Sequence, residues 1–200
     1  MQQTILQVGA PVLRQRARPL SLEEIRSESI QRLIESMRET MREAPGVGLA
    51  APQIGYSIQL AVVEDRAEYL EGIPAEALAQ RERAQVPFHV LINPRLYLEH
   101  HAVVEFFEGC LSLTDYVALV PRAVEVRVEC LNERGEPIAI QARGWYARIL
   151  QHEIDHLHGT LYIDRMLSRS FMSAENLARY WQDQSQEELY AALGLPPRLH

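Results

Sequence analysis

The segment QHEIDHLHGTLY at 151–162 constrains the fold of this chain more than any other, because it contains the pattern H-E-x-x-H. Its two histidines, His152 and His156, are four residues apart, so a helix places both side chains on one face about one turn apart. Glu153 follows the first histidine and can reach a water molecule on a shared metal ion without binding that ion. The pattern therefore predicts a helix with two metal ligands, and the fold has to bring a third ligand to it.

The residues alone leave the third ligand undecided. The longer pattern H-E-x-x-H-x-x-G-x-x-H would require histidine where the chain has Tyr162. A site of the thermolysin kind would use a downstream glutamate, for which the candidates are Glu175, Glu187 and Glu188. Cys110 is favoured, because a thiolate binds soft and borderline metals strongly and Gly109 beside it permits close backbone approach. Cys130 lies in the alternating segment VEVRVECL and is expected to be a small buried hydrophobic residue.

Charge and composition exclude several classes of function. The net charge is −7, which argues against a nucleic-acid partner, since phosphate binding requires clustered positive charge. All twenty basic residues are arginine, which excludes a Schiff-base lysine or a phosphate-binding lysine. Two cysteines cannot form a disulfide framework and fit a reducing compartment. The chain has no run of 18 or more apolar residues and no secretory signal, so no membrane partner is expected.

The pattern of apolar residues predicts one α+β domain over 1–200, with mixed or antiparallel strands packed around the H-E-x-x-H helix. Helices are expected at 21–44, where Ser21 and Glu24 form a capping box, and at 144–158, closed by Gly159. A last amphipathic segment follows within 167–200. Residues 65–87 are charged and alanine-rich and predict a surface excursion. Strands are expected at 57–64, 91–98, 102–108, 117–120 and 124–131.

Three segments together resemble a known family. GVGLAAPQ at 46–53, EGCLS at 108–112 and QHEIDH at 151–156 are similar, in this order, to the three signature motifs of peptide deformylases. The resemblance covers nearly the whole chain, from PVLR near its start to IDRM at 163–166. The segment GWYARILQHEIDH and the excursion at 65–87 resemble the mitochondrial-type branch of that family, and these features are compatible with a bacterial member.

The resemblance implies hydrolysis of the N-formyl group of formyl-methionine at the start of new polypeptides, with release of formate. It makes Cys110, His152 and His156 the ligands of one divalent metal, Fe(II), with zinc, nickel or cobalt as replacements. Glu153 becomes the catalytic acid and base. Gln53 and the backbone N–H of Leu111 become the donors that face the formyl oxygen.

The resemblance also implies the peptide contacts. The loop of Gly46, Val47, Gly48 and Leu49 would hold the peptide backbone extended together with Gly109. The methionine side chain would lie among Val47, Glu108, Trp145 and Ile149. Val117 stands where many bacterial deformylases carry an arginine, which would alter peptide preference. Asp155 should point away from the metal and pair with Arg122 or Arg148.

Two rival functions differ in one testable feature each. A thermolysin-like peptidase would keep its metal without Cys110, and a metal-stabilised binding module without turnover would have no use for Glu153. Ribosome docking by the last segment is not expected, because its acidic residues outnumber its basic ones (Glu175, Asp183, Glu187 and Glu188 against Arg179 and Arg198). The start ILQVGAPVLR resembles the mature start of the family. A bacterial cytoplasmic protein is therefore expected, with a processed mitochondrial or plastid protein as the alternative.

Overall fold

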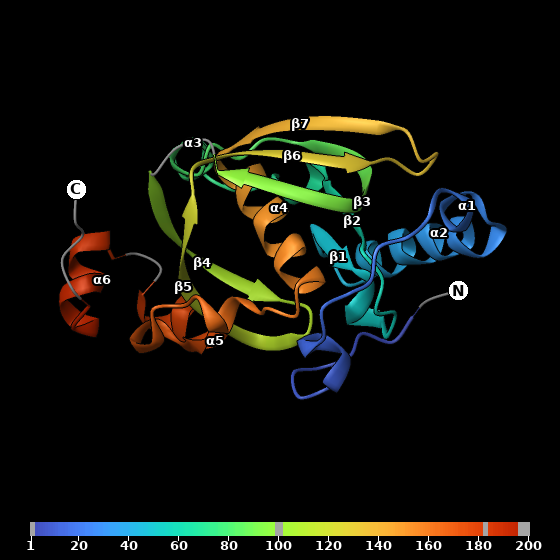
Figure 1. Ribbon diagram of the computed structural model, residues 1–200. Coiled ribbons are helices and arrows are strands. Elements are labelled where there is room, and N and C mark those ends of the chain that lie inside the picture. Colours follow the sequence, from blue (N-terminus) through green and yellow to red (C-terminus); the bar gives the residue numbers. More distant parts are fainter. Residues whose placement is uncertain (1–2, 99–101, 182–183, 196–200) are drawn as a thin grey trace.

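Two antiparallel sheets enclose helix α4 (Gly144–Leu157) in the computed structural model, which describes residues 3–98, 102–181 and 184–195 (Figure 1). The first sheet has five strands in the order β1 (Gly48–Ala50), β2 (Leu60–Asp65), β3 (Val86–Leu98), β6 (Glu125–Leu131) and β7 (Pro137–Arg143). The second has the order β4 (Val103–Cys110), β5 (Leu113–Ala123) and β8 (Met172–Ser173). The prediction of an α+β fold with antiparallel strands is therefore confirmed.

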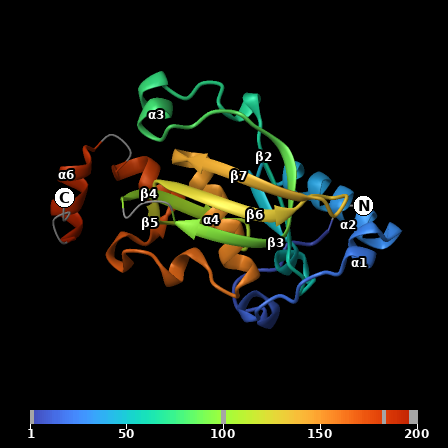
Figure 2. The same cartoon turned by 45° about the horizontal axis from the view of Figure 1, so that its top comes forward.

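The end of the first sheet formed by β1 and β2 is buried on both faces. In β2, Ala61 and Val63 belong to the core cluster that contains the apolar residues of α4. Leu60 and Val62 point the other way and join the cluster formed with helix α2 (Glu28–Glu43). Successive side chains of a strand point to opposite faces, so a strand covered by a helix on each side needs an unbroken apolar run. The sequence LAVV meets this need, and Figure 2 shows α2 and α4 on their separate sides of these strands.

The helix expected at 21–44 is two helices, α1 (Leu22–Arg26) and α2. The capping box of Ser21 and Glu24 is present at the start of α1. Ser27 has extended backbone angles, donates its hydroxyl to Glu24 O at 2.6 Å and accepts from Ile30 N–H at 3.4 Å. Its side chain therefore ends one helix and begins the next, as serine at an N-cap position does. The apolar spacing continues across this break, which is why the sequence suggested one helix.

The segment at 65–87 begins with the last residue of β2 and ends with the first two residues of β3, with helix α3 (Ala75–Gln80) between them. It packs against the start of α4, where Trp145 N–H donates to Arg81 O at 2.8 Å. Gly144 has a φ of +58°, and a Cβ there would lie 2.4 Å from the Cβ of Glu82. Glycine is therefore required where the excursion meets the helix that carries the histidines.

The C-terminal segment is interrupted rather than one amphipathic helix. It contains α5 (Ala174–Asn176), a π-helical stretch (Leu177–Trp181) and α6 (Gln186–Leu193), whose Leu189 and Tyr190 pack against Leu119 of β5. Asp183 and Arg198, which entered the charge argument, lie outside the described residues. The remaining short elements are 3₁₀ turns at Pro11–Arg14, Ala51–Ile54, Ala67–Tyr69, Tyr162–Asp164 and Ser168–Ser170. Over the described ranges, every helix is too short or too polar to cross a membrane.

Candidate metal centre and cleft

Helix α4 brings two histidines to the end of β4, where Cys110 lies. The Nε2 atoms of His152 and His156 are 3.2 Å apart, and Cys110 Sγ lies 3.3 Å from His156 Nε2. All three donor atoms lie within 4.8 Å of one another. In a tetrahedral site, metal bonds of about 2.0 Å to nitrogen and 2.3 Å to sulfur separate the donors by about 3.3–3.6 Å. The three side chains therefore have the chemistry and the spacing to hold one transition-metal ion.

Other candidate ligands lie elsewhere. Within residues 3–98, 102–181 and 184–195, no second group of three or more His, Cys, Asp or Glu side chains could hold a metal ion. The downstream glutamates belong to α5 and α6, and the Tyr162 hydroxyl donates to Tyr116 O at 2.9 Å. Cys130 is buried on β6, and burial raises the pKa of its thiol to about 11, as expected for a small buried residue.

Glu108 orients the first histidine. Its Oε2 lies 3.0 Å from His152 Nδ1, and the carboxylate accepts from Arg122 at 2.9 and 3.0 Å and from Arg148 at 2.6 Å. Burial alone would raise the pKa of Glu108, but hydrogen bonds from His152 and Arg122 outweigh it and hold that pKa well below its ordinary value. An ionised carboxylate only accepts, so His152 Nδ1 carries the proton. The lone pair of Nε2 is then directed at the metal position.

Asp155 of α4 forms ion pairs with two arginines. It accepts from Arg122 Nη1 at 2.5 Å and from Arg165 at 2.6 and 2.7 Å. Of the two partners that the sequence left open, the contact is with Arg122, whereas Arg148 binds Glu108. Arg122 therefore connects α4 to the carboxylate that holds His152.

Glu153 is buried against β1 with a carboxylate that is only partly satisfied. Its side chain lines the cleft, and no described residue hydrogen-bonds its Oε2. Burial, with a smaller contribution from Glu108, raises the pKa of Glu153 to about 7. A Cβ on Gly48 would lie 2.2 Å from Glu153 Oε1, so only glycine leaves room for this carboxylate. The group can therefore both accept and release a proton near neutral pH.

The orientation of the Gln53 amide is set by its neighbours. Its Oε1 accepts from Ala50 N–H at 2.8 Å, so Nε2 points towards Ser112 Oγ at 3.2 Å and Cys110 Sγ at 3.5 Å. Leu111 follows Cys110 at the turn between β4 and β5 and lines the same cleft. Two donors from distant segments thus lie beside the three candidate metal ligands.

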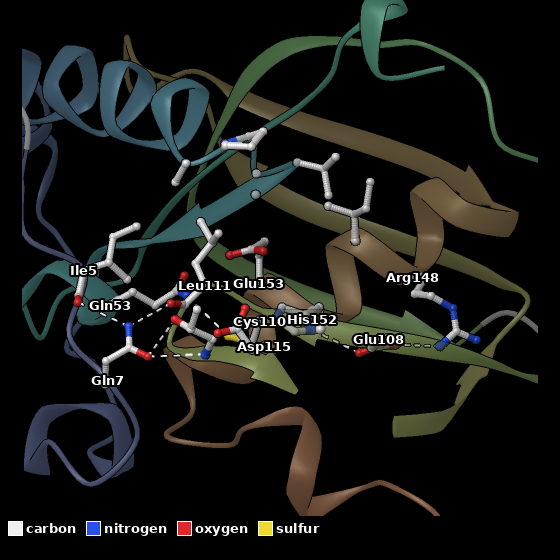
Figure 3. A pocket seen from close by; sticks show the side chains of 18 of the residues that line it. Ile5, Gln7, Gln53, Glu108, Cys110, Leu111, Asp115, Arg148, His152 and Glu153 are labelled. Atoms are coloured by element: carbon white, nitrogen blue, oxygen red, sulfur yellow. Dashed lines mark hydrogen bonds and ion pairs between the residues drawn. The ribbon is translucent and has the colours of Figure 1, made fainter. Parts of the chain in front are cut away.

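The cleft has a volume of about 580 Å³ and contains most of the expected site residues (Figure 3). Its walls include Gly46, Val47, Gly48, Gln53, Glu108, Gly109, Cys110, Leu111, Trp145, Ile149, His152 and Glu153. The side chain of Leu49 is instead fully buried in the core cluster with α2, and His156 is buried behind the cleft surface. Val117 is on β5, where it pairs with Met172 of β8, and its effect on peptide preference stays a prediction.

Sequence reasoning missed several cleft residues. Thr114 and Asp115 line the cleft and follow the EGCLS segment after one intervening residue, so their place was foreseeable. Ile5 and Gln7 also line it, and no local pattern marked them. His89 has no ligand spacing in the sequence, which predicts a surface position, as it does for His100, His101 and His200. In the structure His89 is half-buried, and its Nε2 lies 2.9 Å from the Tyr146 hydroxyl. His100, His101 and His200 lie outside the described residues.

Comparison with known proteins identifies what the chain resembles. A family model described as polypeptide deformylase matches residues 2–171. Peptide deformylase 1A, chloroplastic, of Solanum lycopersicum is 47% identical over 173 residues, which is 86% of this chain but 62% of the relative, so the chain spans about three fifths of that protein. Peptide deformylase 3 of Streptomyces avermitilis is 43% identical over 95% of this chain and 83% of its own length. A Met-Ala-Ser-bound class I type b peptide deformylase from Acinetobacter baumannii has a TM-score of 0.74 at 31% identity, covering 83% of this chain and 99% of that one.

Proposed function

The chain belongs to the polypeptide deformylase family, and we propose that it removes the formyl group from N-formyl-methionyl peptides and releases formate. The observation that carries the proposal is one cleft whose wall holds Cys110, His152 and the buried carboxylate of Glu153, with His156 directly behind that wall and within reach of the same metal position. A binding module without turnover would have no use for a buried carboxylate that lines the cleft and has an oxygen to which no described residue donates a hydrogen bond. The arrangement fits hydrolysis.

We propose that Cys110, His152 and His156 hold one divalent metal, Fe(II) in the cell, with zinc, nickel or cobalt as substitutes. The donor set supports this, because two imidazoles and a thiolate suit all four metals. When bound, such a metal acts as a Lewis acid that makes water a better nucleophile and the formyl carbon a better electrophile. Three protein ligands leave a position open for the reacting groups, as in catalytic rather than structural sites.

Glu153 is proposed to move the proton. Its carboxylate takes a proton from the attacking water while the water oxygen forms a bond to the formyl carbon. The bond from that carbon to the methionine nitrogen then breaks, and Glu153 passes the proton to the departing amine. The products are formic acid and a peptide with a free amino terminus, and Glu153 returns to its ionised form. The formic acid then loses its proton to the new amino group or to solvent and leaves as formate. Burial raises the pKa of Glu153 above its ordinary value, which makes the carboxylate a stronger proton acceptor than an exposed glutamate.

Gln53 and Leu111 are proposed to stabilise the charge that develops on the formyl oxygen. The amide of Gln53 and the backbone N–H of Leu111 supply hydrogen bonds that strengthen as this oxygen becomes negative. Loss of one such donor in comparable sites costs on the order of 3 kcal/mol. Support comes from the fixed orientation of the Gln53 amide towards Cys110 and Ser112.

The peptide is proposed to lie extended along β1. This strand is at the end of the first sheet, so one of its edges is open to pair with an added strand. The backbone of Gly46, Val47, Gly48 and Leu49 would hold the peptide from one side and Gly109 from the other. Val47, Trp145 and Ile149 line the cleft and would contact the methionine side chain together with Glu108, whose charge is already matched by arginines.

Nascent formyl-methionyl chains are therefore the proposed substrate class, and the net charge of −7 gives no support to a nucleic-acid partner. Matching proteins include plant organellar and bacterial forms. We propose the bacterial cytoplasm as the compartment, because the Streptomyces relative matches 95% of the chain, with a plastid or mitochondrion as the alternative.

The test is formate release from formyl-Met-Ala-Ser by anaerobically purified protein, with metal content measured in every sample. Wild type should release formate, and Glu153→Ala should keep its metal but lose activity by about 10²–10⁴-fold. Cys110→Ala should lose the metal. Glu187→Ala, which removes an exposed glutamate of α6, is the matched control and should keep both metal and activity.

Each result separates one alternative. Metal-loaded wild type that releases no formate would overturn the proposed function. If Cys110→Ala retained a full equivalent of metal, the ligand set would be wrong. Loss of metal in Glu187→Ala would favour a glutamate ligand of the thermolysin kind.

A further inference from the structure

The chain segment at residues 5–8 crosses one end of the cleft. Figure 3 shows Ile5 and Gln7 beside Leu111 and Gln53, at the end opposite Arg148. Both Ile5 and Gln7 line the cleft, and Gln7 contacts the turn between β4 and β5, which lies more than a hundred residues further along the chain. The proposed mechanism uses neither residue, so this contact requires its own explanation.

The side chain of Gln7 bridges the turn between β4 and β5. Its Nε2 donates to Leu111 O at 3.0 Å, and its Oε1 accepts from Thr114 N–H at 3.3 Å and from Thr114 Oγ1 at 3.0 Å. A longer contact of 3.5 Å joins the same Nε2 to Ile5 O. One amide group therefore holds Leu111 of the turn and Thr114 near the start of β5 by its opposite ends.

The backbone of the same segment ties this turn to the loop that carries Gln53. Leu6 N–H donates to Gln53 O at 2.8 Å, and Val8 N–H donates to Ser112 O at 2.7 Å. Three consecutive residues therefore contact both segments that supply the proposed donors to the formyl oxygen. Gln53 Nε2 also reaches Ser112 Oγ at 3.2 Å, so the two segments and the chain at 5–8 form one connected unit.

We propose that Gln7 is a positioning residue for the pair of donors that stabilise the formyl oxygen, an inference that rests on the proposed function. Two donors on segments 58 residues apart act on one oxygen only if both hold their place to a fraction of an ångström. Leu111 supplies one donor through its N–H and is held through its C=O, so a bond from Gln7 to that carbonyl limits rotation of the turn around it. Thr114, bound to the other end of the amide, limits the turn at its far side.

The test compares Gln7→Met with Gln31→Met. Methionine keeps the length of glutamine and removes its polar atoms, and Gln7 is exposed, so the variant should fold. Gln31 is the matched control, because its Nε2 also bridges two carbonyls, Ile25 O and Glu133 O at 2.8 Å each, outside the cleft. Formate release from formyl-Met-Ala-Ser is measured over a range of concentrations, with metal content and thermal stability measured for each protein.

We expect Gln7→Met to lower kcat on the order of tenfold and to leave KM within about twofold, a fraction of the 10²–10³-fold loss caused by removing a donor outright. The loss is partial because the backbone bonds of Leu6 and Val8 remain. Gln31→Met should change neither constant. Thr114→Val removes one end of the same bridge, so adding it to Gln7→Met should cause less than the product of the two single losses.

The outcomes distinguish this role from the proposed function. Active wild type with an undiminished kcat in Gln7→Met overturns the positioning role and leaves deformylation standing. A fall in thermal stability without a change in kcat also overturns it, since that pattern belongs to a structural contact. An equal loss of kcat in Gln31→Met overturns it as well. Wild type that holds metal but releases no formate overturns the proposed function and this inference together.

Discussion

Adding a single methyl group at Gly48 should lower kcat, because the methyl group would displace the carboxylate of Glu153. The glycine lies on β1 against the buried Glu153, and a Cβ there would be 2.2 Å from Oε1, 2.5 Å from Cδ and 2.8 Å from Cγ of that residue. An ordinary contact begins at 3.4 Å, so the carboxylate oxygen of Gly48→Ala would have to withdraw by about 1.2 Å. A catalytic group misplaced by about 1 Å can lower the reaction rate about 100-fold. We therefore expect kcat to fall by about that factor, which corresponds to a rise of about 3 kcal/mol in the activation free energy.

Gly109→Ala is the matched control. It adds a methyl group to the same cleft, but its Cβ would lie 3.5 Å from the nearest atom, Val117 Cγ1, and would not touch Glu153. Both variants should raise KM, because both narrow the space for the peptide. Only Gly48→Ala should lower kcat, and both should keep their metal.

The assay is formate release at saturating formyl-Met-Ala-Ser, with metal content measured alongside. If Gly48→Ala kept a wild-type kcat, or if Gly109→Ala lost as much, the steric argument for Glu153 would be refuted. Loss of metal in Gly48→Ala would also contradict it, because the contact is with Glu153 and not with a proposed ligand.

Three further predictions concern metal binding and stability. Glu108→Gln should weaken metal affinity about 10–100-fold, as measured by metal titration, because the carboxylate orients His152. The same variant should destabilise the fold by about 3 kcal/mol in urea unfolding, because the buried arginines lose their charged partner. Leu150→Ala, at a fully buried position of α4, should cost about 2–5 kcal/mol in urea unfolding, and Leu98→Ala, 63% exposed, about 0.5 kcal/mol or less. The hydrogen bond from Arg42 lowers the pKa of Glu64, so this pair stabilises the fold above the ordinary pKa of 4.5 and loses its effect as pH falls through the folded value. Wild type should therefore exceed Glu64→Gln in stability at pH 7 by a margin that disappears in acid, and a margin that grew in acid would contradict the assignment.

Helix α4 was predictable because the residue spacings that indicate it lie within a few positions of one another in the sequence. His152 and His156 share a face by their spacing alone, Glu153 follows from its neighbour, and Gly159, with a φ of +73°, ends the helix at the predicted place. The apolar run of β2 was equally readable, since a strand buried on both faces needs one. The break at Ser27 was not, because the apolar spacing of α1 and α2 continues across it.

The third donor shows the limit of residue reasoning. Several side chains had suitable chemistry, and Cys110 was only the favoured one until the order of three segments pointed to a family. In the structure Cys110 lies at the end of β4, within 4.8 Å of both histidine nitrogens. That convergence depends on how the second sheet packs against α4, which no spacing along the chain records.

The chain itself thus determined the chemistry that is available: two imidazoles and a carboxylate on one helix face, a thiol beside a glycine, and strands able to pack on both sides. Tertiary structure alone decided how these groups are held. Glu108 of β4 contacts His152 of α4, and the segment at 65–87 packs against Gly144 at the start of that helix. Gln7 contacts Leu111, which is more than a hundred residues away in sequence. The physical reason is that the apolar pattern of a helix or strand repeats every two to four residues and can therefore be read from a short stretch of sequence. The partners that orient a reactive side chain are brought together by burial of distant segments, and such contacts leave no periodic trace in the sequence.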